Sequence, residues 1–551
     1  MRKLYFFFCF FLILFPLRIS AQNYTSKPKL VVGIVIDQMR YDYLYRFAER
    51  YGEGGFKRLL NGGFNCRNAH YNYVPTETAP GHASIYTGAT PSMHGIIANN
   101  WFENGADMYC VQDTTVKTVG SETPNGMMSP KNLIATTITD QLKLATNQRS
   151  KVIAISIKDR GAILPAGHFA DAAYWYDRMN GRFVSSSFYM KELPKWVQDF
   201  NNLKLPDKFL SQTWNTLLPI QNYSISTADD TPYEAPFQGK DKPTFPYNLA
   251  ELSEKMRKSP MKVPPYDMLT CTPFGNTLVK EMALRALEFE KLGKTEGVTD
   301  FLAISFSSTD IVGHAFGTNS IELQDTYIRL DRDLAQLLEY FDKEVGEGNY
   351  LLFLTADHAA TEVPNYLKDL GMTAGYISTK GIRQKIEDYL TQRYGEGRWI
   401  LEMDDKQIYL NRHLINSKNL VLSEIQKQVA EITLQQEGIA YTFTATQLKE
   451  QYYGDGIGQF VQNGFFPKKS GDVIMVPQAH WLSDYWKKGT SHGTPYSYDT
   501  HIPLLFYGWQ IKKGSTIERI YITDIAPTIA TLLNIQFPSN CTGNPIEDLF
   551  D

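Results

Sequence analysis

Residues 350–358 carry the stretch YLLFLTADH, in which an apolar run leads directly into Asp357 and His358. The run has the length and composition of a strand that is buried on both faces. Ligands of open α/β sheets bind outside the carboxyl ends of the strands, where this stretch places a carboxylate beside an imidazole. Both groups are common metal ligands. The stretch therefore indicates an α/β fold with a site at the end of this strand.

Other apolar runs adjoin polar residues in a similar way. They are Leu30–Ile36 before Asp37, Val152–Ile157 before Lys158, Phe301–Phe306 before Asp310, and Pro503–Tyr507 after His501. Amphipathic helical patterns lie between them, over Asn276–Leu292 and Glu322–Tyr340. Alternating strands and helices predict a mostly parallel sheet with helices on both faces.

Two long regions interrupt this alternation. Residues 165–268 are rich in Tyr, Trp, Pro, Asn and Asp, and we predict an irregular insertion that lies over the sheet. Residues 362–480 mix helical patterns with short alternating runs such as Trp399–Leu410, and we predict an inserted subdomain that returns to the core near His492. We expect both insertions to act as caps over a site.

The N-terminus of the 551-residue chain has the pattern of a secretory signal peptide over residues 1–21. Arg2 and Lys3 precede an apolar run over 5–17 that is shorter than a membrane span, and small residues end at Ala21. We therefore expect a mature chain of 22–551 with no membrane span, exported across the inner membrane, and a periplasmic location.

Composition and charge narrow the function classes. The chain is 43% hydrophobic and 13% aromatic, as expected of a globular protein. Without residues 1–21 it has 52 Lys and Arg against 59 Asp and Glu, a net charge of −7. An acidic chain gives no reason to expect nucleic-acid binding. A site for an anion must therefore carry positive charge of its own.

Four cysteines remain after the predicted cleavage: Cys66, Cys110, Cys271 and Cys541. Their wide spacing argues against a zinc knot, and an exported chain can form two disulfides. Four cysteines allow three pairings, of which we favour Cys66 with Cys110 because they flank one continuous segment.

Six potential metal ligands fall at or near the ends of the predicted elements: Asp37, Asp310, His314, Asp357, His358 and His492. Three carboxylates and three imidazoles suit two zinc ions. Asp310 and His314 are four residues apart, so a helical turn would place both on one face. Each pair alone is more often a helix cap or a satisfied polar group, but the six together predict a metal site.

A helix is predicted to begin in the stretch PTETAPGHASIY, residues 75–86. Thr78 precedes a proline suited to the first helical turn, so Thr78 can serve simply as the N-cap. Alternatively, its hydroxyl lies at the positive end of the helix, where an anion binds, and a metal would activate it as a nucleophile. His82 falls inside the helical pattern and is predicted to be structural.

Lys158 and Arg160 follow a predicted strand and could hold an anion. Such a pair is usually solvated, but beside a metal site it fits a phosphate monoester, whose three non-bridging oxygens suit a forked guanidinium and an ammonium. Asn99 could donate its amide to another oxygen, although Asn99 and Asn100 are equally placed for this role and either could be a turn residue.

Taken together, these residues resemble the alkaline phosphatase superfamily, and more closely the secreted bacterial alkaline phosphatases of the PafA type, which use a threonine nucleophile. The matching stretches are IDQMR at 36–40, TAPGH at 78–82, IKDRG at 157–161, Thr309-Asp310 with His314, TADH at 355–358 and SHG at 491–493. The resemblance implies an alkaline-phosphatase-like α/β fold, with a mostly parallel central sheet and inserted cap or crown segments.

The resemblance also implies roles for the site residues. One zinc would be held by Asp310, His314 and His492, and a second by Asp37, Asp357, His358 and the Thr78 oxygen. Thr78 would attack phosphorus to give a phosphothreonine, while Asn99, Lys158 and Arg160 hold the phosphoryl oxygens. The expected function is hydrolysis of a broad range of phosphate monoesters to alcohol and inorganic phosphate.

Other functions share parts of this pattern. A nucleotide pyrophosphatase or phosphodiesterase shares the fold, the metals and the threonine, but a diester has only two non-bridging oxygens, so Lys158 and Arg160 favour monoesters. A sulfatase needs Cys-x-Pro-x-Arg, and CRNAH at 66–70 lacks the proline and the final arginine. A phosphomutase normally works in the cytoplasm, which conflicts with the predicted signal peptide. A non-catalytic zinc-stabilised binding protein would need neither Thr78 nor the basic pair.

Overall fold

The computed structural model describes residues 27–259, 263–404 and 406–550, so the predicted signal peptide lies outside the described residues.

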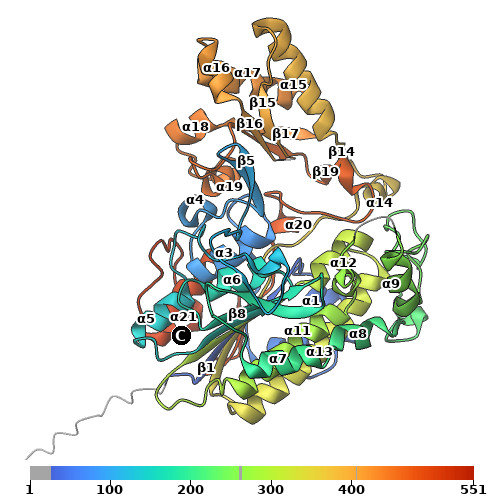
Figure 1. The fold of residues 1–551 in the computed structure, drawn as a ribbon, viewed down its shortest axis with the longest axis vertical. Coiled ribbons are helices and arrows are strands. Elements are labelled where there is room, and N and C mark those ends of the chain that lie inside the picture. Colours follow the sequence, from blue (N-terminus) through green and yellow to red (C-terminus); the bar gives the residue numbers. More distant parts are fainter. Residues whose placement is uncertain (1–26, 260–262, 405, 551) are drawn as a thin grey trace, which may run out of the picture.

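A ten-stranded sheet forms the centre of the molecule, in the order β21-β2-β20-β13-β1-β12-β7-β8-β9-β6 (Figure 1). The five strands from β13 to β8 are parallel. Their bounds are Tyr350–Thr355 (β13), Leu30–Ile36 (β1), Asp300–Phe306 (β12), Val152–Ser156 (β7) and Ala172–Asp177 (β8). The outer strands are Gly514–Thr516 (β21), Phe64–Cys66 (β2), Leu504–Gly508 (β20), Arg182–Ser186 (β9) and Thr118–Val119 (β6).

The central strands form where the sequence has continuous apolar runs. Every residue of β1, β12 and β13 is buried, as expected for parallel strands covered on both faces. In the register, Ile36 of β1 pairs with Phe306 of β12, and Val35 pairs with Thr355 of β13. The three strands therefore end level with one another, and the residues that follow them share one edge of the sheet.

Helices cover both faces of this sheet, which confirms the predicted fold class. One layer contains α3 (Thr78–Thr87), α5 (Ile138–Ala145), α6 (Asp159–Ala166) and α21 (Ile525–Leu533). The other contains α11 (Phe274–Phe289), α12 (Ser308–Phe316) and α13 (Ile321–Glu344). Shorter elements include α1 (Tyr43–Arg46), α2 (Phe56–Gly62), α4 (Pro91–His94), α20 (Ser497–Thr500), and the ribbons β4–β5 (Asn100–Glu103, Ala106–Tyr109) and β3–β22 (Ala69–His70, Ile520–Tyr521).

The prediction of an irregular insertion over residues 165–268 needs correction at its start. Strand β8 extends the parallel sheet, and β9 pairs with it antiparallel. The remainder consists of loops and short elements: α7 (Lys195–Asn202), α8 (Leu205–Leu210), β10–β11 (Thr213–Trp214, Tyr247–Asn248), α9 (Leu249–Arg257) and α10 (Asp267–Thr270). The sequence of β8, AAYWYD, mixes aromatic residues with an acid and therefore lacks the apolar run of the other core strands.

Residues within the predicted inserted region 362–480 form a second sheet with its own apolar core, above the main sheet in Figure 1. The strand order is β15-β16-β18-β17, with bounds Ile400–Met403, Gln407–Leu410, Val473–Pro477 and Ile439–Thr444. The helices are α14 (Pro364–Asp369), α15 (Thr379–Tyr394), α16 (Arg412–Ser417), α17 (Leu422–Leu434), α18 (Ala445–Glu450) and α19 (Gly456–Gly464). Strands β14 (Gly375–Ile377) and β19 (Trp481–Ser483) pair where the chain leaves and returns.

The cysteine prediction is wrong. Cys66, Cys110, Cys271 and Cys541, all within the described part of the chain, are free thiols. Cys66 ends β2 near one edge of the sheet, whereas Cys110 follows β5 and donates its backbone N–H to Asn99 O. The two flank one segment in sequence and are both buried, but Cys66 lies near Asp524 and Asp548, whereas Cys110 lies near Asp159 and Arg160.

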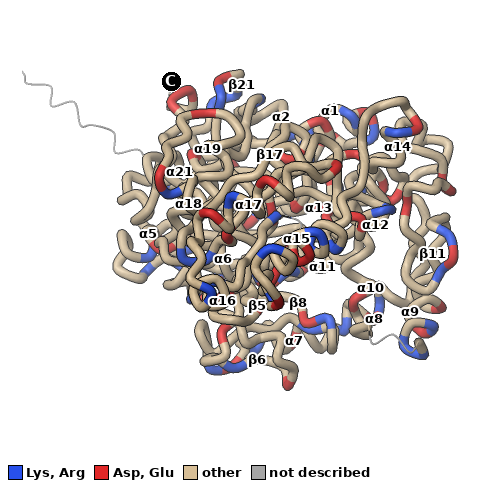
Figure 2. Tube along the Cα trace, turned by 90° about the horizontal axis from the view of Figure 1, so that it is seen from above, with Lys and Arg blue, Asp and Glu red and all other residues tan. Residues whose placement is uncertain are grey.

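Charges of both signs are mixed along the chain trace (Figure 2). Within the described ranges, the longest apolar helices fall short of what a membrane crossing requires.

Candidate active site

Three aspartates meet at the shared edge of the parallel strands. Asp37 follows β1 directly, and its backbone N–H donates to Phe306 O at 2.9 Å. Asp310 lies in the first turn of α12 after β12, and Asp357 lies two residues beyond β13. All three are almost completely buried. The level ends of the strands thus bring these carboxylates together.

The first of two groups that could hold a metal ion consists of Asp310, His314 and His492, with potential ligand atoms within 4.8 Å of one another. The imidazole Nε2 atoms of His314 and His492 lie 3.1 and 3.7 Å from Asp310 Oδ1. On the other side of each ring, Nδ1 donates to a backbone carbonyl, of Thr490 at 2.7 Å and of Thr76 at 2.6 Å. A ring that donates through Nδ1 presents a lone pair at Nε2, as a metal ligand must.

The second group consists of Asp37, Asp310 and His358. His358 Nε2 lies 3.5 Å from Asp37 Oδ1 and 3.8 Å from Asp357 Oδ1. Asp357 therefore borders this group, and Asp310 takes part in both. The structure brings all six predicted ligands into one site, but Asp310 lies at its centre.

The residues present fit metal ions. Within the described chain, the buried atoms Asp37 Oδ1 and His358 Nε2 have no hydrogen-bond partner, although such atoms are costly to leave unpaired. Burial lowers the pKa of His358 and of His492, which keeps both imidazoles neutral and able to bind a metal. Burial, followed by the charge of Asp357, raises the pKa of Asp37, as expected for buried carboxylates that lie close together, whereas Lys158 acts in the opposite direction.

Thr78 is the first residue of α3, but it is not the N-cap. Glu77 holds that position, and no side chain of the helix start caps it. Instead, Asn99 Oδ1 accepts the Ala79 N–H at 2.9 Å, from a segment twenty residues further along the chain. The Thr78 hydroxyl is therefore available for chemistry at a helix N-terminus. His82 is structural, as predicted: its ring nitrogens contact Thr78 O and Ser305 Oγ, both at 2.9 Å.

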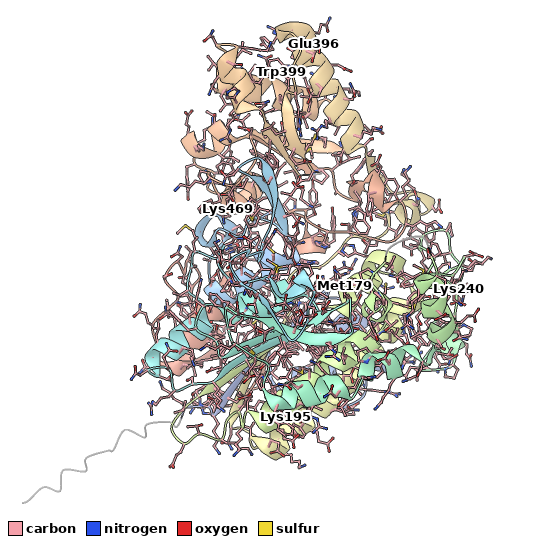
Figure 3. All side chains as sticks on the ribbon, in the orientation of Figure 1. Met179, Lys195, Lys240, Glu396, Trp399 and Lys469 are labelled. Atoms are coloured by element: carbon pink, nitrogen blue, oxygen red, sulfur yellow. The ribbon has the colours of Figure 1, made fainter. Side chains whose placement is uncertain are left out.

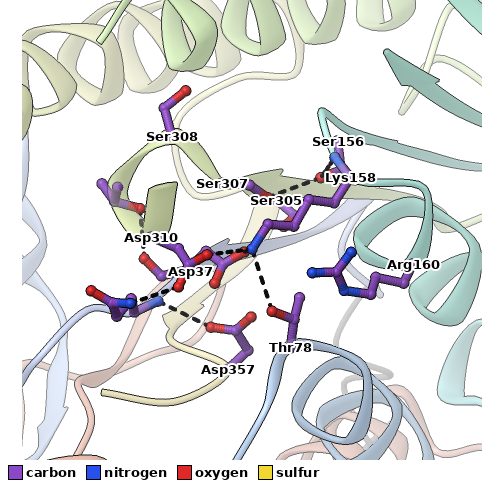
Figure 4. Close-up of polar contacts among 12 residues, drawn as sticks. Asp37, Thr78, Ser156, Lys158, Arg160, Ser305, Ser307, Ser308, Asp310 and Asp357 are labelled. Atoms are coloured by element: carbon purple, nitrogen blue, oxygen red, sulfur yellow. Dashed lines mark hydrogen bonds and ion pairs between the residues drawn. The ribbon is translucent and has the colours of Figure 1, made fainter. Parts of the chain in front are cut away.

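Lys158 lies between the metal-ligand groups and Thr78 (Figure 4). Its Nζ donates to Asp310 Oδ2 at 2.6 Å, to Asp37 Oδ2 at 2.7 Å and to Thr78 Oγ1 at 3.4 Å. Burial alone would lower the pKa of Lys158, but Asp310 and Asp37 hold it above the ordinary value, so the ammonium stays charged. Arg160 extends toward the same space from the start of α6.

Several residues of the site were not predicted from the sequence. Gln38 adopts a φ of 65° and donates Nε2 to Asp310 Oδ1 at 2.7 Å, and its position after Asp37 was the one available signal. Tyr109 accepts from Arg160 Nη1 at 3.1 Å. Trp486 stacks on His314 with ring centroids 4.5 Å apart. Tyr109 and Trp486 meet the site only through the tertiary fold.

Glu77 and Lys406 form a second unpredicted contact, between the core and the inserted subdomain. Lys406 Nζ lies 3.0 Å from Glu77 Oε1, and Glu77 Oε2 accepts the Asn99 N–H at 2.8 Å. Asn99 in turn caps α3 beside Thr78. The subdomain is thus connected to the start of α3 through three side chains.

Gly81 allows α3 to approach the end of β13 closely. A Cβ at this position would lie 2.3 Å from Asp357 O and 2.8 Å from Asp357 Cβ. The absent side chain therefore brings the Thr78 end of α3 against the aspartate that follows β13.

The fold and this arrangement of ligands define a member of the alkaline phosphatase superfamily. Residues 31–501 match the profile of type I phosphodiesterase / nucleotide pyrophosphatase, and the chain belongs to this family. Within it, the resemblance to PafA-type alkaline phosphatases expected from the sequence is confirmed.

The relatives match over nearly their whole length. An alkaline phosphatase PhoV of Synechococcus elongatus is 47% identical over 95% of this chain and 93% of its own. A protein named calcium-transporting ATPase of Myroides odoratus is 46% identical over 98% of this chain and 97% of its own. An alkaline phosphatase PafA of Elizabethkingia meningoseptica is 44% identical over 96% of this chain and 95% of its own. A crystal structure of wild-type PafA matches with a TM-score of 0.91 at 44% identity, covering 96% of this chain and all of that one.

Proposed function

We propose that this chain is a zinc-dependent alkaline phosphatase that hydrolyses phosphate monoesters through a phosphothreonine on Thr78. The observation that carries the proposal is the position of the Thr78 hydroxyl, at the start of a helix and 3.4 Å from Lys158 Nζ, which also contacts Asp37 and Asp310. Full-length relatives named alkaline phosphatase support the reaction class.

Two zinc ions are proposed, one held by Asp310, His314 and His492 and the other by Asp37, Asp357, His358 and Thr78. When bound, such ions supply Lewis acidity and neutralise the charge of the clustered carboxylates. Thr78 Oγ attacks phosphorus in line, which forms the new O–P bond as the bond to the alcohol oxygen breaks. A water molecule then attacks the phosphothreonine and releases inorganic phosphate, which restores the Thr78 hydroxyl.

Lys158, Arg160 and Asn99 are proposed to hold the transferred phosphoryl group. Because the Asn99 amide oxygen is engaged by Ala79 N–H, its amide nitrogen is the group that can donate to a phosphoryl oxygen. Fixed donors directed at these oxygens stabilise the charge of the transition state. A variant of PafA whose structure is known carries substitutions of one threonine, one asparagine, one lysine and one arginine. The threonine–asparagine and lysine–arginine spacings in that set equal those between Thr78 and Asn99 and between Lys158 and Arg160.

The basic pair favours monoesters over the diesters suggested by the family description. A monoester dianion offers three non-bridging oxygens to Lys158, Arg160 and Asn99, whereas a diester replaces one of them with a second substituent. The N-terminal pattern of Arg2, Lys3 and the apolar run after them supports export to the periplasm, with a mature chain of 22–551.

Purified protein supplied with zinc should hydrolyse p-nitrophenyl phosphate much faster than bis-p-nitrophenyl phosphate. A chelator should abolish this activity, and added zinc should restore it. Comparable or faster turnover of the bis-ester would refute the monoesterase assignment, and activity that survives complete removal of metal would refute the metal dependence.

A further inference from the structure

A second group of buried acids lies outside the catalytic site, where the segment 227–247 packs against the junction of α12 and α13. Glu234 belongs to this segment and Glu322 to the first turn of α13. Their exposed fractions are 1% and 0%. Carboxylates are almost never buried to this extent unless they are paired.

One oxygen of each carboxylate, Oε1, accepts a hydrogen bond from a hydroxyl group. Glu234 Oε1 accepts from Thr227 Oγ1 at 3.3 Å, and Glu322 Oε1 accepts from Tyr247 Oη at 2.5 Å. The Oε2 atoms of both residues are fully buried and have no hydrogen-bond partner in the described part of the chain. An unpaired buried acceptor has a large desolvation penalty, and two such atoms from two acids that interact electrostatically indicate a missing cation or proton.

Glu234 and Glu322 differ from an ordinary buried ion pair because both are acids. Burial, followed by the charge of Glu322, raises the pKa of Glu234 to about 9, and burial raises the pKa of Glu322 to about 8. Asp229 adds a third negative charge nearby. Lys240, at the outer edge of this region (Figure 3), donates to Pro246 O at 3.1 Å, and burial lowers its pKa while Asp229 and Glu322 raise it.

We propose that Glu234 and Glu322 bind a divalent cation of the calcium class through their unpaired Oε2 atoms. Hard carboxylate oxygens are the ligands that Ca²⁺ prefers, and the flexible coordination of Ca²⁺ admits further neutral oxygens. The Thr231 hydroxyl, a buried atom beside Glu234, provides one such oxygen.

The position of this site gives it a structural role. Tyr233 O accepts the Gly489 N–H at 2.7 Å, and Ala235 N–H donates to Ala315 O at 2.8 Å. Ala315 follows His314, and Gly489 precedes the loop that carries His492. The residues on either side of Glu234 therefore support the backbone of the Asp310–His314–His492 group, and a cation on Glu234 would fix this segment to α13.

The test uses protein stripped of metal, reloaded with stoichiometric zinc, and compared with and without millimolar CaCl₂. Bound calcium is measured by elemental analysis after gel filtration, and the unfolding temperature Tm by calorimetry. Wild type should retain about one calcium per chain, and its Tm should rise by about 2 °C or more in CaCl₂. Glu234→Gln and Glu322→Gln should lose both responses.

Glu339→Gln makes the same chemical change at an exposed position of α13 and should behave as wild type. A proton shared by the two acids predicts the opposite pattern: no bound calcium, no effect of CaCl₂, and a Tm that Glu322→Gln leaves unchanged or raises. That pattern, or a calcium response that persists in Glu322→Gln, would overturn the proposal. A larger response to MgCl₂ than to CaCl₂ would overturn the calcium assignment. Calcium retention by wild type stands even if a variant fails to fold, and none of these measurements depends on phosphatase activity.

Discussion

Replacement of Lys406 by methionine tests whether the inserted subdomain positions the catalytic residues. Lys406 contacts Glu77 at 3.0 Å, Glu77 accepts the Asn99 N–H, and Asn99 caps α3 beside Thr78. Methionine keeps most of the side-chain volume and removes the charge. Without Lys406, Glu77 loses the partner of its Oε1 atom, and its hydrogen bond to the Asn99 N–H is left to hold the carboxylate alone.

The size of the effect follows from the burial of this pair. The side chains of Lys406 and Glu77 are 21% and 11% exposed, between a surface pair and a fully buried one. Exposed pairs contribute about 0–1 kcal/mol, and breaking a fully buried pair costs about 3–5 kcal/mol. We therefore expect a loss of about 1–2 kcal/mol, which is roughly a 5- to 30-fold decrease in kcat/KM if it falls on the transition state.

The assay is kcat/KM for p-nitrophenyl phosphate at saturating zinc. Lys418→Met is the matched control, because Lys418 donates to Tyr394 O within the subdomain, and it should leave kcat/KM near wild type. In an Asn99→Ala background, Lys406→Met should have little further effect, because its influence passes through Asn99. Unchanged kcat/KM in Lys406→Met, or the same loss with and without Asn99, would refute this reasoning.

Two further predictions concern the chemistry itself. Thr78→Ala should abolish phosphate release. Elemental analysis should show a zinc content close to that of wild type, since Asp and His side chains supply the other ligands. Substantial residual turnover would mean that another residue is the nucleophile. Lys158→Ala combined with Arg160→Ala should reduce kcat/KM for monoesters by roughly 100-fold or more, given a loss of about 1.5–3 kcal/mol for each charged hydrogen bond, and should affect bis-p-nitrophenyl phosphate far less. An equal loss on both substrates would contradict the proposed phosphate clamp.

The sequence predicted the strands that are buried on both faces, because such strands are continuous apolar runs. Leu30–Ile36 and Tyr350–Thr355 agree with β1 and β13 at both ends. Strand β8 was missed because its aromatic and acidic composition is also typical of loops. The disulfide prediction failed because proximity in sequence says little about proximity in a large core.

The candidate ligands could be found individually, since each falls near the end of an element. Their arrangement in space could not be predicted from the sequence. The central position of Asp310 depends on how α12 is oriented after β12, and the capping of α3 by Asn99 depends on a contact between segments. Threonine is a common N-cap residue, but Glu77 holds the N-cap position of α3, and Asn99 supplies the acceptor for the Ala79 N–H.

The chain leaves the main sheet after His358, builds the inserted subdomain, and returns just before His492. The group formed by Asp310, His314 and His492 therefore closes only when this returning segment is in place. A metal held by these residues binds the docked state and not the undocked one, so metal affinity and docking of the subdomain are linked, and each must change the other by the same free energy. Substitutions inside the subdomain, far from any substrate, should thus be detectable as altered zinc retention before they alter the fold.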